Sequence, residues 1–155
     1  MNPQIAAPTN TLTAECASPS MEMLSDLRAA HNQLLICVSE MEHVTSELEP
    51  NPLRYTGARL RISQASLARR GLVHRIIKHL SRVVSSADAH ALQALEATDA
   101  QNARQSTTHV SRWTVDAIQA DWAGYQKGSL EIRTRIKEGI KAEQQVLYPL
   151  LQLCR

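Results

Sequence analysis

The sequence predicts an all-α fold, specifically an up-and-down four-helix bundle, from three observations. Four amphipathic segments of about 20–30 residues follow one another with short connections. Phe is absent, so the core has to be built from Leu, Ile, Val, Met and Ala with two Trp, which suits packed helices better than a sheet. No alternating strand pattern competes with the helical periodicity. The 155 residues fit one domain, predicted at 21–155 behind a disordered tail at 1–20.

The tail prediction rests on composition, because residues 1–20 combine scattered Pro, Ser and Thr with no Lys or Arg and no long apolar run. The same features argue against a signal peptide. The first helix is expected to start near Ser20 or Met21 and to end at the break formed by residues 49–52. Its apolar stripe has three- and four-residue spacing and consists of Leu24, Leu27, His31, Leu34, Val38, Met41 and Leu48.

The second helix is expected from about Thr56 to Ser85 and Ser86. Its apolar stripe consists of Ile62, Ala65, Leu72, Val73, Ile76, Leu80 and Val83. Residues 88–125 are helical in composition, with an interruption expected around residues 105–108, where a Ser or Thr could cap a new helix or mark a kink.

The last helix is expected from about Ser129 to Gln152, after Gly124 and Gly128 loosen the backbone. Glu143 lies near the middle of its apolar arc, which also holds Ile132, Ile136, Gly139, Ile140, Leu147 and Leu150. An isolated carboxylate in a core costs several kcal/mol unless a cation, a metal or a hydrogen-bond partner compensates it. Glu143 therefore predicts a buried polar site.

The segment that ends this helix, Val146-Leu147-Tyr148-Pro149-Leu150-Leu151, resembles the last helix of the hemerythrin-like (HHE cation-binding) family. That helix typically reads His, three residues, Glu, Glu and then Leu-aromatic-Pro-Leu-Leu. Aligned on this ending, the family's ligand glutamate falls on Glu143 and its histidine falls on Gly139. The resemblance covers roughly residues 21–153 and implies the hemerythrin-like bundle with a site for iron or another divalent metal.

The resemblance also identifies candidate histidine ligands. His31 matches the family's first-helix ligand and lies within the apolar stripe, although such a position more often holds a buried neutral histidine bonded to a neighbour such as Glu143. His74 could stand for the second-helix histidine, but Lys78 occupies the position of the following glutamate. His79 lies at the flank of that helix, and both histidines could simply be surface residues.

The third helix of the family tends to carry His-x-x-x-His, and here Trp113 takes the second place after His109. The predicted metal ligands are thus His31, Glu143, His79, His109 and His74. Without a metal, Arg69 is the alternative partner, because it falls on the apolar side of the second helix and could reach Glu143 or Asp121.

These observations predict a non-enzymatic bundle protein with an eroded metal site and a regulatory or binding role. The alternative is a genuine iron-binding sensor or carrier. We expect no cofactor unless the ligand set is intact, in which case iron or another divalent metal would bind. The basic series Arg59, Arg61, Arg69, Arg70 and Arg75 could bind phosphate or could form a solvated, salt-bridged helix face.

Charge and cysteine usage limit the partners. A net charge of +2 gives no electrostatic case for nucleic acid, and no apolar run approaches the eighteen residues of a membrane span. Three widely separated cysteines predict a reduced, cytoplasmic protein. A protein partner or a small ligand, and a homodimer, remain open.

Overall fold

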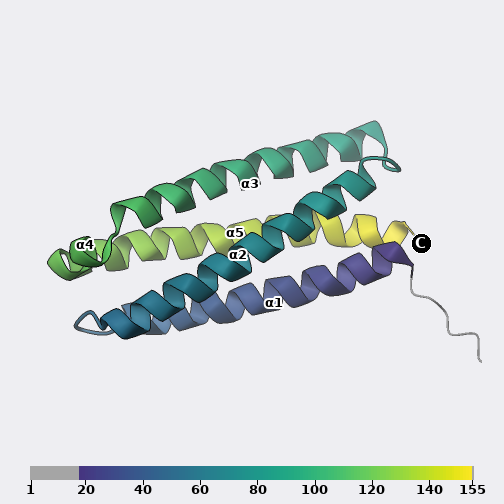
Figure 1. Ribbon diagram of the computed structural model, residues 1–155. Coiled ribbons are helices and arrows are strands. Elements are labelled where there is room, and N and C mark those ends of the chain that lie inside the picture. Colours follow the sequence, from purple (N-terminus) through teal and green to yellow (C-terminus); the bar gives the residue numbers. More distant parts are fainter. Residues whose placement is uncertain (1–17, 155) are drawn as a thin grey trace, which may run out of the picture.

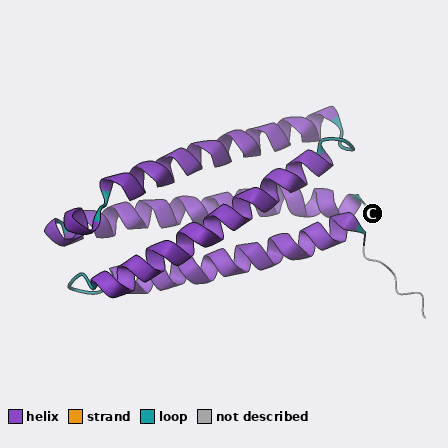
Figure 2. Ribbon diagram, viewed as in Figure 1, coloured by secondary structure: helices purple, strands orange, loops and turns teal. Residues whose placement is uncertain are grey.

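The computed structural model describes residues 18–154, which form five α-helices and no strand (Figure 2). These helices are α1 (Pro19–Thr45), α2 (Pro52–Leu80), α3 (Ser86–Arg112), α4 (Val115–Ala120) and α5 (Trp122–Leu153). The predicted all-α class is confirmed. The predicted tail lies outside the described residues, apart from residues 18–20.

The four long helices lie lengthwise beside one another, and each runs opposite to the one before it (Figure 1). The short helix α4 turns the chain between α3 and α5 at one end. α1 packs along α2 and α5, whereas α3 packs mainly on α5 and touches α2 little. α2 and α3 approach each other at the loop that joins them and separate toward the end that carries α4 (Figure 1).

Side-chain caps fix where the helices begin. The Ser18 side chain accepts the N–H of Met21, so α1 begins at Pro19 and includes Ser20, which is buried. The Asn51 side chain accepts the N–H of Arg54, and Pro52 takes the first helical position, where its missing N–H costs nothing. α2 therefore begins four residues before the predicted Thr56.

Two predicted helix ends were too late. α1 ends at Thr45, so Leu48 is outside the helix and 97% exposed. Pro50 disfavours helical geometry at the residue before it, which obliges the helix to end upstream. α2 ends at Leu80, and Val83 is exposed in the turn that follows. In both places the apolar spacing continues past the last helical residue by coincidence.

The predicted interruption at residues 105–108 was wrong, because α3 runs unbroken to Arg112. The hydroxyls of Thr107 and Thr108 donate to carbonyls four residues earlier, so neither side chain caps a new helix. The break comes after Trp113, where the Thr114 side chain accepts the N–H of Ala117 and begins α4.

The last helix begins at Trp122, seven residues before the predicted Ser129, because Asp121 caps it by accepting the N–H of Gly124. Gly124 and Gly128 are therefore helical. A Cβ on Gly128 would lie 3.0 Å from the Trp113 indole nitrogen, so this glycine permits the close approach of the end of α3.

The core has two apolar clusters separated by polar residues. One cluster lies near the N-terminus of α1 and the C-terminus of α5 and is mainly aliphatic. Its members include Leu24, Leu27, Leu72, Ile76, Leu80, Leu92, Leu147 and Leu151. The other lies near α4 and is partly aromatic, comprising Met41, Val44, Tyr55, Ala58, Trp113, Ile118 and Tyr125. Along the helices, the buried side chains of His31, Arg69 and Glu143 fall between the two.

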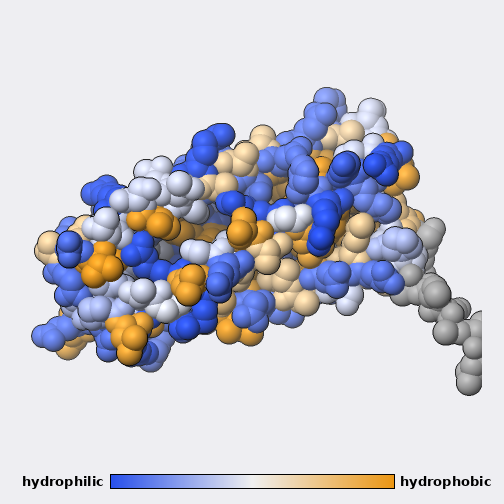
Figure 3. Space-filling model, in the orientation of Figure 1, coloured by the Kyte–Doolittle hydropathy of each residue, from blue (hydrophilic) through white to orange (hydrophobic). Residues whose placement is uncertain are grey.

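On the face seen in Figure 3, exposed apolar side chains are scattered among hydrophilic ones. No helix within residues 18–154 combines the length and the apolar character needed to cross a membrane.

Candidate functional site

Glu143 is the centre of a network that we call the polar network, formed by His31, Arg69, Asp99, Glu143 and Tyr148. Glu143 is 1% exposed, and its Oε2 lies 2.7 Å from Nε2 of His31 on α1. Its other oxygen, Oε1, accepts a hydrogen bond from Nη1 of Arg69 on α2. Nη2 of Arg69 donates to Oδ1 of Asp99 on α3 at 3.0 Å. Each of the four long helices thus contributes to one continuous chain of polar contacts.

Both ring nitrogens of His31 are engaged. Nδ1 lies 2.8 Å from the hydroxyl of Tyr148, and Nε2 lies against Glu143. A neutral imidazole carries one donor and one acceptor nitrogen. The arrangement is satisfied when Nε2–H donates to the carboxylate and Nδ1 accepts the Tyr148 hydroxyl, whose pKa is raised chiefly by burial. The Tyr148 ring also stacks on the imidazole, with centroids 5.7 Å apart.

The network supplies the compensation that a buried Glu143 requires. The predicted approach of His31 and Glu143 is confirmed, as is the predicted contact of Arg69 with Glu143. Asp121, the other partner considered for Arg69, instead caps α5. Sequence reasoning missed Asp99, although it continues the spacing of Leu92 and Leu95 along the inward face of α3.

The residues at this centre do not fit a metal ion. Within residues 18–154, no group of three or more His, Cys, Asp or Glu side chains lies close enough to hold one. At Gly139, where the resemblance has a histidine, the position of a Cβ lies 3.9 Å from Nη1 of Arg69. Next to Glu143 the donor set therefore holds one imidazole, and the second carboxylate, Asp99, is joined to it only through the Arg69 guanidinium, which would repel a cation.

The structure does not bring the other predicted ligands to this centre. His79 lies 3.2 Å from the Ser20 hydroxyl at the start of α1. His74 is exposed and faces Glu96 of α3, with 3.4 Å between Nδ1 and Oε1. His109 stacks on the ring of Tyr125, nearer α4, with centroids 5.8 Å apart.

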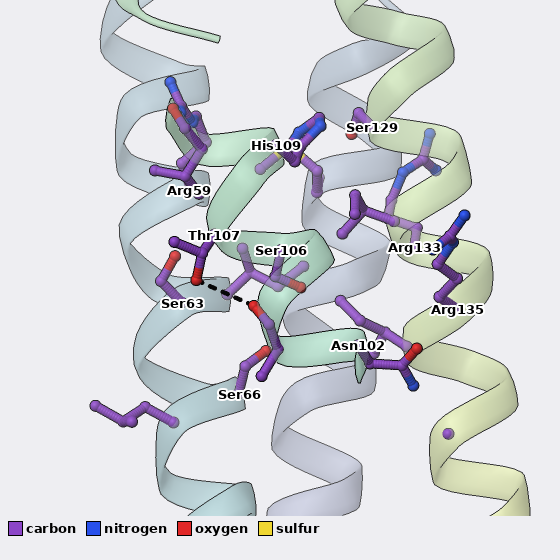
Figure 4. Close-up of a pocket in the computed structure, with 18 of the residues that line it drawn as sticks. Arg59, Ser63, Ser66, Asn102, Ser106, Thr107, His109, Ser129, Arg133 and Arg135 are labelled. Atoms are coloured by element: carbon purple, nitrogen blue, oxygen red, sulfur yellow. Dashed lines mark hydrogen bonds between the residues drawn. The ribbon is translucent and has the colours of Figure 1, made fainter. Parts of the chain in front are cut away.

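A cavity of about 370 Å³ lies beside the polar network, between α2, α3 and α5, where α2 and α3 separate (Figure 4). Five arginines line it, three from α2 and two from α5: Arg59, Arg69, Arg70, Arg133 and Arg135. The α3 wall adds His109. Six hydroxyl side chains also line it: Ser63, Ser66, Ser106, Thr107, Ser111 and Ser129. Among the described residues, no Asp or Glu lines this cavity.

The basic series of the second helix divides between two environments. Arg59, Arg69 and Arg70 line the cavity, whereas Arg61 pairs with Glu40 at the surface and Arg75 is exposed outside it. The salt-bridged interpretation is therefore confirmed for Arg61 and Arg69, and phosphate binding by the cavity arginines stays a prediction.

Arg133 is a buried cavity residue that sequence reasoning did not single out. It is 7% exposed, and Nη2 donates to the Thr45 hydroxyl at 3.2 Å. The nearest carboxylate oxygen, on exposed Glu42, is 3.9 Å away. Nε is buried without a hydrogen-bond partner in the described part of the chain, and burial lowers the pKa of the guanidinium. Its place one turn before Ile136 and two turns before Ile140, on the same apolar face, was the available signal.

His109 on α3 lines the same cavity and lies between Arg59 and Ser129 in the view of Figure 4. Burial holds its pKa below the usual value, the cations Arg59 and Arg112 lower it further, and Glu131 opposes them. His109 is therefore predominantly neutral at pH 7.

The chain matches no known family model, no curated protein and no solved structure. The hemerythrin-like resemblance accordingly rests on the sequence alone, chiefly on the last helix and on His31.

Proposed function

We propose that this chain is a non-enzymatic binding protein, a four-helix bundle of the hemerythrin-like type in which the polar network stands in place of a metal centre. The observation that carries the proposal is the pairing of Glu143. One of its oxygens is held by His31 and the other by Arg69. The carboxylate that the resemblance makes a metal ligand is thereby compensated by protein groups.

The pairing works against a metal on two counts. A divalent cation at Glu143 would lie beside the Arg69 guanidinium, and like charges at such distances repel strongly where water is excluded. An imidazole binds a metal through a free nitrogen lone pair, and here both ring nitrogens of His31 already face protein partners, the Tyr148 hydroxyl and Glu143.

The cavity supports the binding role. Arg69 belongs both to the polar network and to the cavity wall, so the contacts that tie α2 to α3 and α5 also hold that wall in place. A preformed hollow of a few hundred Å³, with apolar walls and a few fixed polar groups, is the usual form of a small-molecule site.

The proposal is tested by measuring iron, zinc and manganese in the purified protein and its melting temperature with and without EDTA. Three proteins are compared: wild type, Glu143→Gln, and the control Glu138→Gln, which changes an exposed carboxylate on the same helix. We expect no stoichiometric metal and no EDTA effect in any of them. Glu143→Gln should melt at a lower temperature because it weakens a charge-assisted bond, and Glu138→Gln should not.

A second set of results would contradict the proposal. Stoichiometric metal, with an EDTA-induced drop of several degrees in wild type and Glu138→Gln but none in Glu143→Gln, would establish the metal-binding alternative instead.

A further inference from the structure

The cavity lining is much more basic than the chain as a whole. The sequence has 17 basic and 15 acidic residues, yet the cavity is lined by five arginines and one histidine without an acidic side chain among the described residues. Glu143 and Asp99 neutralise only Arg69. Of the other four arginines, Arg133 alone has a described carboxylate within 4.0 Å, at 3.9 Å. Such an excess of positive charge around a hollow favours an anion inside it.

Arg133 provides, within this basic lining, a hydrogen-bond donor that is unpaired in the described part of the chain. Guanidinium groups buried in proteins usually meet a carboxylate or phosphate through two parallel hydrogen bonds. Arg133 is more than nine-tenths buried, but its one described hydrogen bond goes to the neutral hydroxyl of Thr45. Nε, the edge nitrogen used in such paired contacts, has no partner among the described groups. The side chain therefore retains capacity to hold an oxyanion.

Tyr125 and Arg59 place two more donors at the same cavity. Tyr125 is buried, and its hydroxyl donates only to the Met41 sulfur at 3.8 Å, which is a weak acceptor. The Arg59 guanidinium lies over the Tyr125 ring, 5.9 Å from its centroid, and its one described hydrogen bond is a long one to the Val110 carbonyl. Arg59 on α2 and Arg133 on α5 both line this cavity, as does Tyr125 (Figure 4).

The apolar walls of the cavity indicate the uncharged part of the ligand. Ile62 on α2 and Ile132 and Ile136 on α5 provide apolar surface next to these donors. Inorganic phosphate alone would leave that surface in contact with water, whereas an anion with an apolar body covers it.

We infer that the cavity between α2, α3 and α5 binds a small organic oxyanion, a carboxylate or a phosphate monoester, with its charged group on Arg133 and Arg59 and its apolar body on the isoleucines. The inference rests on the proposed binding function and names its ligand class. The two head groups share planar or tetrahedral oxygen acceptors that match the guanidinium fork.

The experiment compares four probes that each contain six carbon atoms: hexanoate, hexyl phosphate, hexanamide and hexylammonium. Binding is followed by the melting temperature and by NMR of the arginine Nε–H groups. We expect one or both anions to stabilise the wild type by several degrees at saturation, and to shift the Arg133 Nε–H signal. Hexanamide and hexylammonium should do neither. Whichever anion binds more tightly identifies the head group.

Matched variants locate the site. Arg59→Gln, which changes a partly exposed residue, should weaken anion binding about tenfold or more, since each 1.4 kcal/mol is a factor of ten and a charged hydrogen bond is worth at least that. Arg133→Gln should abolish it. The control Arg75→Gln, on an exposed part of α2 outside this cavity, should bind as wild type does. Arg59→Gln keeps the test decisive if Arg133→Gln fails to fold.

Several results would overturn the inference. Equal binding of hexanamide would mean that the cavity takes apolar bodies without charge selection, which refutes the anion site and leaves the proposed binding function standing. Unchanged anion affinity in Arg59→Gln, with no shift at Arg133, would put the anion elsewhere. If none of the four probes binds, the anion site is refuted, while the metal and EDTA measurements still decide the proposed function separately.

Discussion

Replacing Arg69 by methionine removes the guanidinium that contacts Glu143 and fills much of the same space with an apolar chain. Both side chains are buried, so the interaction is little screened by solvent. Without Arg69, the Glu143 carboxylate keeps only the contact with His31. Removing one partner of a buried ion pair typically costs about 3–5 kcal/mol, because the other charge is left uncompensated. We expect Arg69→Met to fall in that range.

Replacing the partner, Glu143, should lower the free energy of unfolding by less. In Glu143→Leu, Arg69 keeps its 3.0 Å contact with Asp99, which is partly exposed and therefore reachable by water. His31 loses one acceptor, for which about 1–3 kcal/mol is expected. The double variant, Arg69→Met with Glu143→Leu, removes both charges of the buried pair. It should be more stable than Arg69→Met alone, since packed apolar residues often replace a buried pair without loss.

Urea unfolding followed by circular dichroism at 222 nm measures these differences. With slopes of about 1–3 kcal/mol per molar urea, Arg69→Met should lower the midpoint by roughly 2 M. Arg75→Met, which changes an exposed arginine on the same helix, should stay within about 0.5 kcal/mol of wild type.

The reasoning is refuted if Arg69→Met is no more destabilising than Glu143→Leu. It is also refuted if the free-energy changes of the two substitutions simply add within about 0.5 kcal/mol, because residues in one network should be coupled.

Three further predictions concern single sites. Tyr148→Phe leaves Nδ1 of His31 without its donor and should cost about 1–3 kcal/mol in urea unfolding; no loss would mean that this bond is not formed. The pKa of His109 is lower in the folded state, so the unfolded state binds more protons as the pH falls. The contribution of neutral His109 to the free energy of unfolding is therefore complete above pH 6.5 and is lost as the pH drops from there through the folded-state pKa. His109→Gln should lose less stability than wild type between pH 8 and pH 5, and identical pH profiles would contradict this. Gly71→Ala meets no atom within 4 Å and should gain about 0.5–1 kcal/mol from helix propensity. Gly128→Ala, whose Cβ would come within 3.0 Å of an indole nitrogen, should gain less or lose stability, and equal gains in thermal melts would refute the close packing.

Sequence patterns located the polar site before any helix was placed in space. Glu143 was conspicuous because an acidic residue interrupted an apolar stripe, and His31 did the same in the first helix. Because both side chains had to face the interior, the prediction that they meet followed from burial, and the 2.7 Å contact confirms it. Arg69 was accessible to the same reasoning, since it lies on the apolar side of its helix.

The helix ends near residues 105–122 were not accessible in this way. Thr107 and Thr108 are capping residues by type, but inside a helix their hydroxyls bond to carbonyls one turn back. Thr114 and Asp121 are also capping types, and they do cap helices. Residue type alone does not distinguish these cases, because the choice depends on whether tertiary packing lets the helix continue.

The sequence by itself determined the all-α class and the faces on which charged residues are buried, since helical periodicity and burial cost act within one segment. Only the tertiary structure decided that Asp99 joins the polar network and that Arg59, His109 and Arg133 surround one cavity. These groupings depend on the depth and separation at which helices pack, above all on the parting of α2 from α3. Periodicity within a helix specifies a direction around its own axis, and it carries no information about how far away the neighbouring helix lies.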